Sequence, residues 1–255
     1  MANGQSTNPD IVVCSDARAI SLDAAYRFTA LNAAAAAAGK PFTVALAGGN
    51  TPALLYRLLA SEPFRGAIHW SNTHLFFGDE RAVPIDSRFS NYRMAKETLI
   101  DRIDIPASNV HRIHGEQPDT ELAASAFERE LASIFPNAQV PRIDLILLGM
   151  GSDGHTASLF PNMPSLTENS RWAVRSEPGL DPFVPRITLT LPVLNNAANV
   201  LFLVAGADKA EMVSRVLTGP PDPQALPSQS VRPTNGSLTW LLDRAAAARL
   251  ALNSE

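Results

Sequence analysis

The sequence predicts an α/β protein of three layers, Rossmann-like, with a mainly parallel sheet and helices on both faces. Short apolar runs rich in β-branched residues alternate along the chain with segments of helical composition, and most of the loops between them are short. Strands that alternate with helices in this way favour parallel pairing. No internal repeat and no linker divides the 255 residues. We therefore expect a single domain over 1–255, with residues 1–9 as a flexible N-terminal segment.

The first half of the chain contains three expected strands, at 11–14, 42–47 and 73–77. Helices are expected at 16–39, from residue 53 onward, at 91–100 and at 120–135. The alanine run at 33–38 favours a helix because alanine is the best helix former. Thr51 suits an N-cap and Pro52 the first helical position of the second helix.

The second half continues the alternation. A buried strand is expected after Asp144, and further strands are expected at 172–176, 187–191 and 199–204. A helix should run to Leu217, followed by a proline-rich loop at 220–227. The last segment, 237–250, ends in an alanine-rich stretch and is expected to form a closing helix.

Composition and charge limit the class of protein. Hydrophobic residues make up 45% of the chain and charged residues 18%, which suits a sizeable core and argues against disorder. The net charge of −4 does not indicate a nucleic-acid partner. One cysteine excludes an internal disulfide framework, and we find neither a signal peptide nor an apolar run long enough for a membrane helix. We expect a soluble, cytoplasmic protein with no nucleic-acid or membrane partner.

The strand after Asp144 ends in a glycine-rich loop that carries His155. Ligands of open α/β sheets bind at the carboxyl ends of the strands, and histidine is the side chain whose ordinary pKa lies near neutrality. His155 is therefore predicted to be a general acid or base, although a lone histidine is usually structural. Gly151 is expected to let a ligand approach closely. Asp153 either orients His155 or caps a short helix that we expect to begin there.

The same loop contains a spacing that imitates two known motifs. Gly149-x-Gly151-x-x-Gly154 matches the dinucleotide fingerprint, but that motif needs a full crossover helix and an acidic residue about 20 positions later. Pro161 and Pro164 would end such a helix early. Gly-x-Ser-x-Gly, the nucleophile elbow of esterases, is not matched because Met150 occupies the first glycine position.

Three other strand ends carry groups that suit an anion. Gly48-Gly49-Asn50-Thr51 offers backbone N–H groups at a helix start, although a plain tight turn would look the same. Asp79 and Arg81 follow the next strand, and Arg186 begins a later one; surface ion pairing is the alternative. Lys209 lies in the first turn of its helix, where a cation is disfavoured unless Asp208 or a bound anion compensates. Together these cations suit a phosphate monoester.

The histidine spacing offers one candidate metal site. His111 and His114 form a His-x-x-His pair, but no third ligand lies nearby in the sequence, so a metal site there is disfavoured.

Seven segments resemble the 6-phosphogluconolactonase family and together cover nearly the whole chain. They are Ala47-Gly-Gly-Asn-Thr-Pro52, Phe76-Phe-Gly-Asp-Glu-Arg81, Ser90-Asn-Tyr92, Leu147-Leu-Gly-Met-Gly-Ser-Asp-Gly-His-Thr-Ala-Ser-Leu-Phe-Pro161, Arg186-Ile-Thr188, Gly206-Ala-Asp-Lys209 and Arg232-Pro-Thr-Asn-Gly-Ser-Leu-Thr-Trp-Leu-Leu242. The departures are small: Ala47 stands where a serine is frequent, and Phe183-Val184 replaces a more proline-rich approach to Arg186.

The resemblance implies hydrolysis of 6-phospho-D-glucono-1,5-lactone to 6-phospho-D-gluconate in the oxidative pentose phosphate pathway, without a metal or organic cofactor. It also implies the fold shared with glucosamine-6-phosphate deaminase and ribose-5-phosphate isomerase. In this resemblance His155 is the catalytic base, and Arg81, Arg186 and Lys209 surround the phosphate. A monomer or small homo-oligomer is expected.

Two other functions stay open at this point. One is an isomerase or deaminase acting on an amino-sugar phosphate; that family carries Asn-Glu shortly after its Asp-Gly-His segment, where this chain has Ser158-Leu159-Phe160. The other is a non-catalytic sugar-phosphate sensor, which would have no need for His155.

Overall fold

The computed structural model describes residues 9–251, so the expected flexible segment at 1–9 lies outside the described residues except for Pro9. The chain forms a six-stranded sheet in which every pair of neighbours is parallel. Its order across the sheet is β1 (Asp10–Cys14), β9 (Ser237–Asp243), β8 (Asn199–Val204), β5 (Leu145–Leu148), β2 (Phe42–Leu46) and β3 (Thr73–Phe77). The predicted α/β class with a mainly parallel sheet is confirmed.

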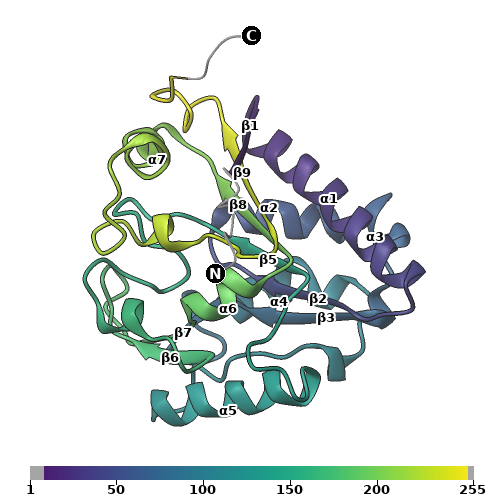
Figure 1. The fold of residues 1–255 in the computed structure, drawn as a ribbon. Helices are drawn as coiled ribbons and strands as arrows, with labels where there is room; N and C mark the ends of the chain where they lie inside the picture. The colour runs from purple at the N-terminus through teal and green to yellow at the C-terminus, as the bar shows by residue number, and fades with distance from the viewer. Residues whose placement is uncertain (1–8, 252–255) are drawn as a thin grey trace.

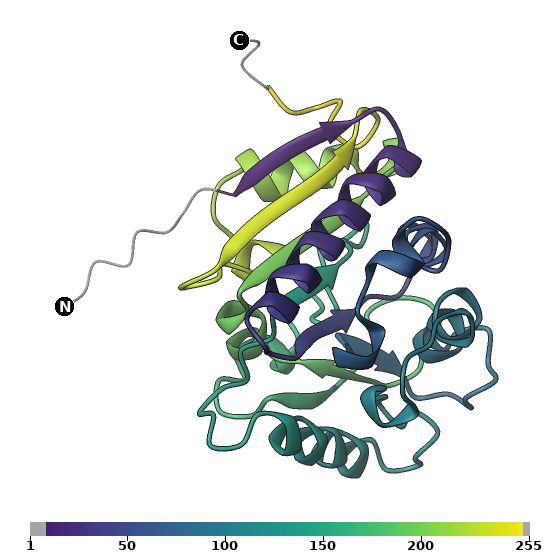
Figure 2. The same ribbon diagram turned by 90° about the vertical axis from the view of Figure 1, so that its right-hand side faces the viewer.

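Helices cover both faces of this sheet (Figure 1). The α-helices are α1 (Ala17–Ala37), α2 (Asn50–Leu59), α3 (Phe64–Ala67), α4 (Asn91–Thr98), α5 (Thr120–Ile134), α6 (Leu191–Asn196) and α7 (Ala210–Thr218). Short 3₁₀ turns are η1 (Trp70–Asn72), η2 (Ile100–Arg102), η3 (Ala107–Asn109), η4 (Pro164–Thr167), η5 (Ala207–Lys209) and η6 (Pro227–Ser230). Figure 2 shows α1 lying across the sheet, with α7 on the other side. Every residue of β2 and β5 is buried, as expected for strands covered on both faces.

A second, smaller sheet was not expected from the sequence. It consists of β4 (Asp79–Arg81), β7 (Arg186–Leu189) and β6 (Ala173–Ser176), with β7 in the middle and both pairings antiparallel. The predicted strands at 172–176 and 187–191 therefore exist within a residue or two, but they form this separate sheet. β4 follows β3 after one residue, Gly78, so the small sheet begins where a strand of the large sheet ends.

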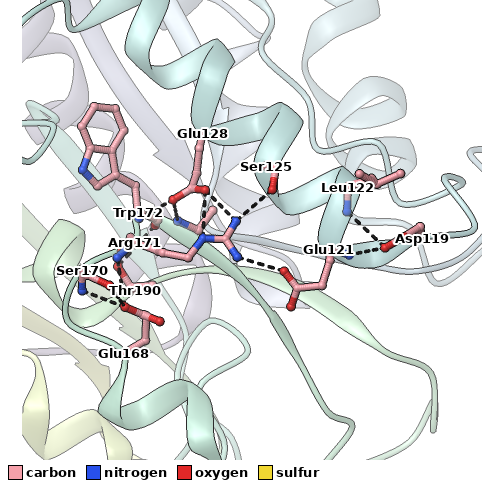
Figure 3. Close-up of polar contacts among 11 residues, drawn as sticks. Asp119, Glu121, Leu122, Ser125, Glu128, Glu168, Ser170, Arg171, Trp172 and Thr190 are labelled. Atoms are coloured by element: carbon pink, nitrogen blue, oxygen red, sulfur yellow. Dashed lines mark hydrogen bonds and ion pairs between the residues drawn. The ribbon is translucent and has the colours of Figure 1, made fainter.

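α5 packs against the small sheet and is tied to it by polar contacts (Figure 3). The Arg171 guanidinium donates to Glu128 at 2.6 and 3.0 Å, to Glu121 at 2.9 Å and to the Ser125 hydroxyl at 3.1 Å. The other oxygen of Glu128 accepts from the backbone N–H of Trp172 at 2.7 Å. These contacts join α5 to the segment that enters β6.

The expected closing helix at 237–250 is wrong. Residues 237–243 form β9, which lies between β1 and β8, and the residues that follow form turns. The alanines at 245–248 favour a helix, but Leu238-Thr-Trp-Leu-Leu242 is an apolar run of strand length, and its position inside the sheet decides the outcome. Trp240 is buried and stacks on Phe202 of β8, with ring centroids 3.8 Å apart.

Two other local predictions need correction. α2 begins at Asn50, with Gly49 as its N-cap at φ 103°, so Thr51 lies within the first turn and does not cap it. The short helix expected after His155 does not form; residues 156–160 make a turn closed by a bridge between Thr156 and Leu159. Ala157 has φ 48°, a left-handed conformation that ends any helix at that point.

None of the helices within residues 9–251 is both long enough and apolar enough to span a bilayer.

Candidate active site

One pocket of about 190 Å³ lies where the two sheets meet, at the carboxyl ends of β2, β3 and β5. The loop after β2 contributes Gly48 and Gly49, and the loop after β5 contributes Gly149, Met150, Gly151, His155 and Ala157. The small sheet contributes Asp79, Arg81 and Arg186. These residues come from four stretches of the chain that are far apart in sequence: 47–49, 78–81, 147–157 and 186. The parallel arrangement of the strands brings the strand ends together.

The structure brings most of the predicted site residues into this pocket. Those that line it are Gly48, Gly49, Asp79, Arg81, Gly151, His155 and Arg186. Asp153 contacts His155. Asn50 and Thr51 lie in the first turn of α2 and do not line the pocket, and neither does Lys209, which precedes α7 and lies 3.7 Å from the Asp208 carboxylate.

His155 and Asp153 form a close pair. Nδ1 of the imidazole lies 2.6 Å from Oδ1 of Asp153, which also accepts from the backbone N–H of His155 at 3.1 Å. Burial opposes ionisation of this carboxyl, but the hydrogen bonds from His155 prevail and lower the pKa of Asp153. Because Asp153 accepts, Nδ1 carries the hydrogen and Nε2 of the neutral ring has a free lone pair. That is the tautomer a general base needs.

Gly151 makes room for this pair. A Cβ atom at this position would lie 2.0 Å from Nδ1 of His155 and 2.6 Å from Oδ1 of Asp153. The Gly151 N–H also donates to the His155 carbonyl at 2.8 Å, which closes the loop. Any larger residue would displace the imidazole.

Two arginines stand directly opposite each other in the small sheet. Arg81 of β4 pairs with Arg186 of β7 in the antiparallel register, and like charges in that relation repel. Burial, and next the charge of Arg81, lower the pKa of Arg186, which is 3% exposed. Within residues 9–251, the buried side-chain nitrogen and oxygen atoms without a hydrogen-bond partner are Nε of Arg81 and Nε of Arg186. An unsatisfied buried donor costs about 1–3 kcal/mol, so this pair suits a bound anion.

Asn91 holds the arginine side of the pocket together, and sequence reasoning assigned it no role. Its amide donates to the backbone carbonyl of Asp79 at 2.9 Å and to the Asp79 carboxylate at 3.0 Å, and its oxygen accepts from the Arg81 guanidinium. Gly48 packs against it: a Cβ there would lie 2.0 Å from the Asn91 oxygen. The sequence feature that could have pointed to Asn91 is its position directly after Ser90, the N-cap of α4.

Glu80 was also missed as a supporting residue. Its carboxylate is 2% exposed and accepts from the backbone N–H groups of Arg81, Asn91 and Tyr92 at 2.7–2.8 Å and from the Ser90 hydroxyl at 3.0 Å. Burial raises the pKa of Glu80, and these backbone hydrogen bonds oppose the rise. A carboxylate at the start of α4 also interacts favourably with the helix dipole. Glu80 thereby fixes α4 to the arginine-bearing strand.

Two of the remaining histidines, His74 and His111, contact each other outside the pocket. Nε2 of His111 lies 2.9 Å from Nδ1 of His74, and Nδ1 of His111 lies 2.6 Å from the Glu130 carboxylate. In the described part of the chain, no three His, Cys, Asp or Glu side chains gather as metal ligands.

The fold and the site together define an α/β enzyme class in which a parallel sheet ends in glycine loops, and an Asp–His pair shares its pocket with buried arginines. A family model described as "Glucosamine-6-phosphate isomerases/6-phosphogluconolactonase" matches residues 15–240. The chain belongs to this family, and the predicted resemblance is confirmed.

Individual relatives agree with this assignment. A 6-phosphogluconolactonase from Synechocystis sp. is 44% identical over 211 residues, which cover 82% of this chain and 84% of the relative. The solved structure of 6-phosphogluconolactonase from Trypanosoma brucei is 31% identical, with a TM-score of 0.86 and coverage of 96% of this chain and 100% of that chain. A monomeric glucosamine-6-phosphate deaminase, 22% identical with a TM-score of 0.78 over 94% of this chain and 99% of its own, shares the fold.

Proposed function

We propose that this protein hydrolyses 6-phospho-D-glucono-1,5-lactone to 6-phospho-D-gluconate. The single observation that carries the proposal is the combination of two facing arginines, each with an unpaired buried Nε, and an Asp–His pair in one pocket. The arginines suit a dianionic phosphate, and the histidine suits activation of water. The relatives named above as 6-phosphogluconolactonases support the choice of substrate.

In the proposed mechanism, neutral His155 removes a proton from water through Nε2 while Asp153 holds Nδ1–H. The water oxygen adds to the lactone carbonyl carbon and gives a tetrahedral oxyanion. When the ring C–O bond breaks, the proton on His155 passes to the departing ring oxygen, which becomes a hydroxyl group. The chain neither gains nor loses a proton over the cycle.

The glycine loops supply the remaining groups. The N-terminus of α2 has no side-chain cap, and Gly48 and Gly49 next to it line the pocket. Backbone N–H groups at such a helix start attract negative charge, so they are suited to the phosphate or the oxyanion. Lys209 is proposed to contribute positive charge from outside the lining residues. Phosphate binding at the arginines would deliver carbon 1 to the histidine rather than leave the encounter to chance.

The alternative functions lack the same support. The proposed reaction uses His155 directly, whereas a sensor does not. Release of ammonia from glucosamine 6-phosphate would favour the deaminase. The cytoplasmic location and the monomeric or small homo-oligomeric state expected from the sequence stay predictions.

The test compares His155→Ala with His114→Ala, an exposed histidine outside the pocket. Lactone opening is followed in a pH-stat, and the spontaneous rate is subtracted. We expect kcat to fall by about 10²–10⁴-fold in His155→Ala, the usual contribution of a general base, and to stay unchanged in His114→Ala. Wild-type enzyme should also prefer the phosphorylated lactone to glucono-1,5-lactone. Near-normal kcat in His155→Ala would refute the role of the histidine.

A further inference from the structure

We propose that Phe160 is a positioning residue for the reaction, because its ring contacts the His155 imidazole and the Arg186 guanidinium at once and so fixes the base relative to the phosphate-binding group. This inference rests on the proposed function and deepens it. The ring centroids of Phe160 and His155 are 4.5 Å apart at an angle of 43°. Cζ of Arg186 lies 5.4 Å from the centroid of the same ring. Phe160 is 1% exposed.

The imidazole needs this second contact. Its hydrogen bond to Asp153 fixes Nδ1, but one hydrogen bond at one corner of the ring does not fix the plane of the ring. A large aromatic side chain packed against the imidazole restricts that rotation. Nε2 then keeps one direction, which is what attack by an activated water requires.

Arg186 needs the ring for a different reason. The guanidinium is buried and makes no salt bridge among the described residues, and the charges of Asp79, Glu80 and Asp181 only partly oppose the lowering of its pKa by burial and by Arg81. Its hydrogen bonds go to the carbonyls of Leu180 and Pro182, at 3.3 and 3.2 Å. An aromatic face stabilises a cation by cation–π attraction without neutralising its charge. A carboxylate in the same place would compete with the substrate phosphate, whereas Phe160 does not.

Phe160 is itself closely packed. Gly179 approaches so closely that a Cβ atom there would lie 2.4 Å from the ring. Gly179 also lies in the loop between β6 and β7, whose carbonyls at Leu180 and Pro182 accept from Arg186. On the other side, the turn from Thr156 to Leu159, with Ala157 in a left-handed conformation, leads directly into Phe160. Two loops therefore position the ring. One leads into β7, which begins at Arg186, and the other follows β5 and carries His155.

The experiment compares Phe160→Leu with Phe28→Leu. Phe28 is fully buried in α1 and does not line the pocket, so it measures the general cost of the same truncation. Both variants are assayed at a temperature at which melting curves show them folded. In Phe160→Leu we expect KM for the phosphorylated lactone to rise about 3- to 30-fold, the range that cation–π contacts span from exposed to buried sites. We expect kcat to fall by about tenfold or more because the base is misplaced. Phe28→Leu should keep both constants.

Two further measurements separate positioning from general loss of structure. With unphosphorylated glucono-1,5-lactone, which does not use Arg186, Phe160→Leu should lower kcat without the rise in KM. In calorimetry with 6-phosphogluconate, Phe160→Leu should weaken binding by the same factor as KM. Wild-type constants in Phe160→Leu, or equal losses in Phe28→Leu, would overturn the proposal.

Failure of the proposed function would look different. Wild-type protein without lactone hydrolysis would refute the lactonase assignment alone, and the calorimetric arm would still decide on Phe160. Unchanged 6-phosphogluconate binding in Phe160→Leu would then overturn the positioning role as well.

Discussion

At the scale of single residues, the candidate site depends on two glycines, because neither position has room for a Cβ atom. The place of a Cβ at Gly151 is taken by the His155 ring, and that of a Cβ at Gly48 by the Asn91 amide. Gly149, in the same pocket, has nothing within 4 Å of where its Cβ would be. The glycines of one pocket therefore differ in whether they can be replaced by a larger residue.

Gly48→Ala is expected to weaken substrate binding. The new methyl group would push Asn91 away, and Asn91 holds both Arg81 and Asp79. Because this disturbs the arginine side and leaves His155 in place, KM should rise about tenfold or more, the cost of a displaced positioning group, while kcat changes less. Steady-state kinetics on the phosphorylated lactone measure both constants.

Gly149→Ala is the matched control for that substitution. It adds the same methyl group to the same pocket where space is open, so both constants should stay within about twofold of wild type. If Gly149→Ala were as damaging as Gly48→Ala, the loss would come from the pocket's volume rather than from Asn91.

Much of the site was accessible from the sequence, and the exceptions share a physical cause. His155, Arg81 and Arg186 follow or begin recognisable strands, so the rule that ligands bind at strand ends pointed to them as candidates. Asn91 acts through tertiary hydrogen bonds to residues 10 and 12 positions earlier, and Phe160 acts through packing. Such contacts leave no periodic signal in a single sequence.

At the scale of elements, the small sheet shows where sequence patterns stop being informative. Alternation and composition located strands near β6 and β7, but they cannot tell which sheet a strand joins, because pairing partners are chosen in three dimensions. The same limit explains why residues 237–243, which form β9, were predicted as part of a helix. Its alanine-rich continuation favours a helix locally, and only burial between β1 and β8 makes it a strand.

The Arg171 contacts that join α5 to the small sheet should matter for stability. Arg171→Ala would leave the Glu128 carboxylate, 23% exposed, without its guanidinium partner. We expect the free energy of unfolding to fall by about 1–3 kcal/mol, as for loss of a partly buried charged hydrogen bond. Urea unfolding measures it.

Arg175→Ala provides the comparison, because the Arg175–Glu177 pair lies in β6 and its neighbouring loop with both side chains largely exposed. It should cost less than about 1 kcal/mol, as exposed ion pairs do. Equal losses in the two variants would contradict a special role for the Arg171 contacts.

At the scale of the whole molecule, stability should depend on pH through His74, which lies in β3, an edge strand of the six-stranded sheet. Burial, and next the neighbouring His111, lower the pKa of His74 below its ordinary 6.5. The unfolded chain therefore takes up a proton before the folded one does. The stability due to a neutral His74 is present above pH 6.5 and is lost progressively as the pH falls below it.

Urea unfolding at pH 7.5 and pH 5.5 tests this linkage. The free energy of unfolding should decrease toward pH 5.5 in wild type, and the decrease should be smaller in His74→Gln. His114→Gln, at an exposed histidine, should keep the wild-type decrease. A decrease of the same size in His74→Gln would assign the pH dependence to other groups.

The register of β4 against β7 has a consequence for the whole fold. Placing Arg81 opposite Arg186 sets two cations against each other in the native state, an electrostatic frustration that opposes folding. An anion that binds between them relieves that frustration, so binding and folding reinforce each other by linkage. A phosphate or other anion added to the protein should therefore raise its free energy of unfolding.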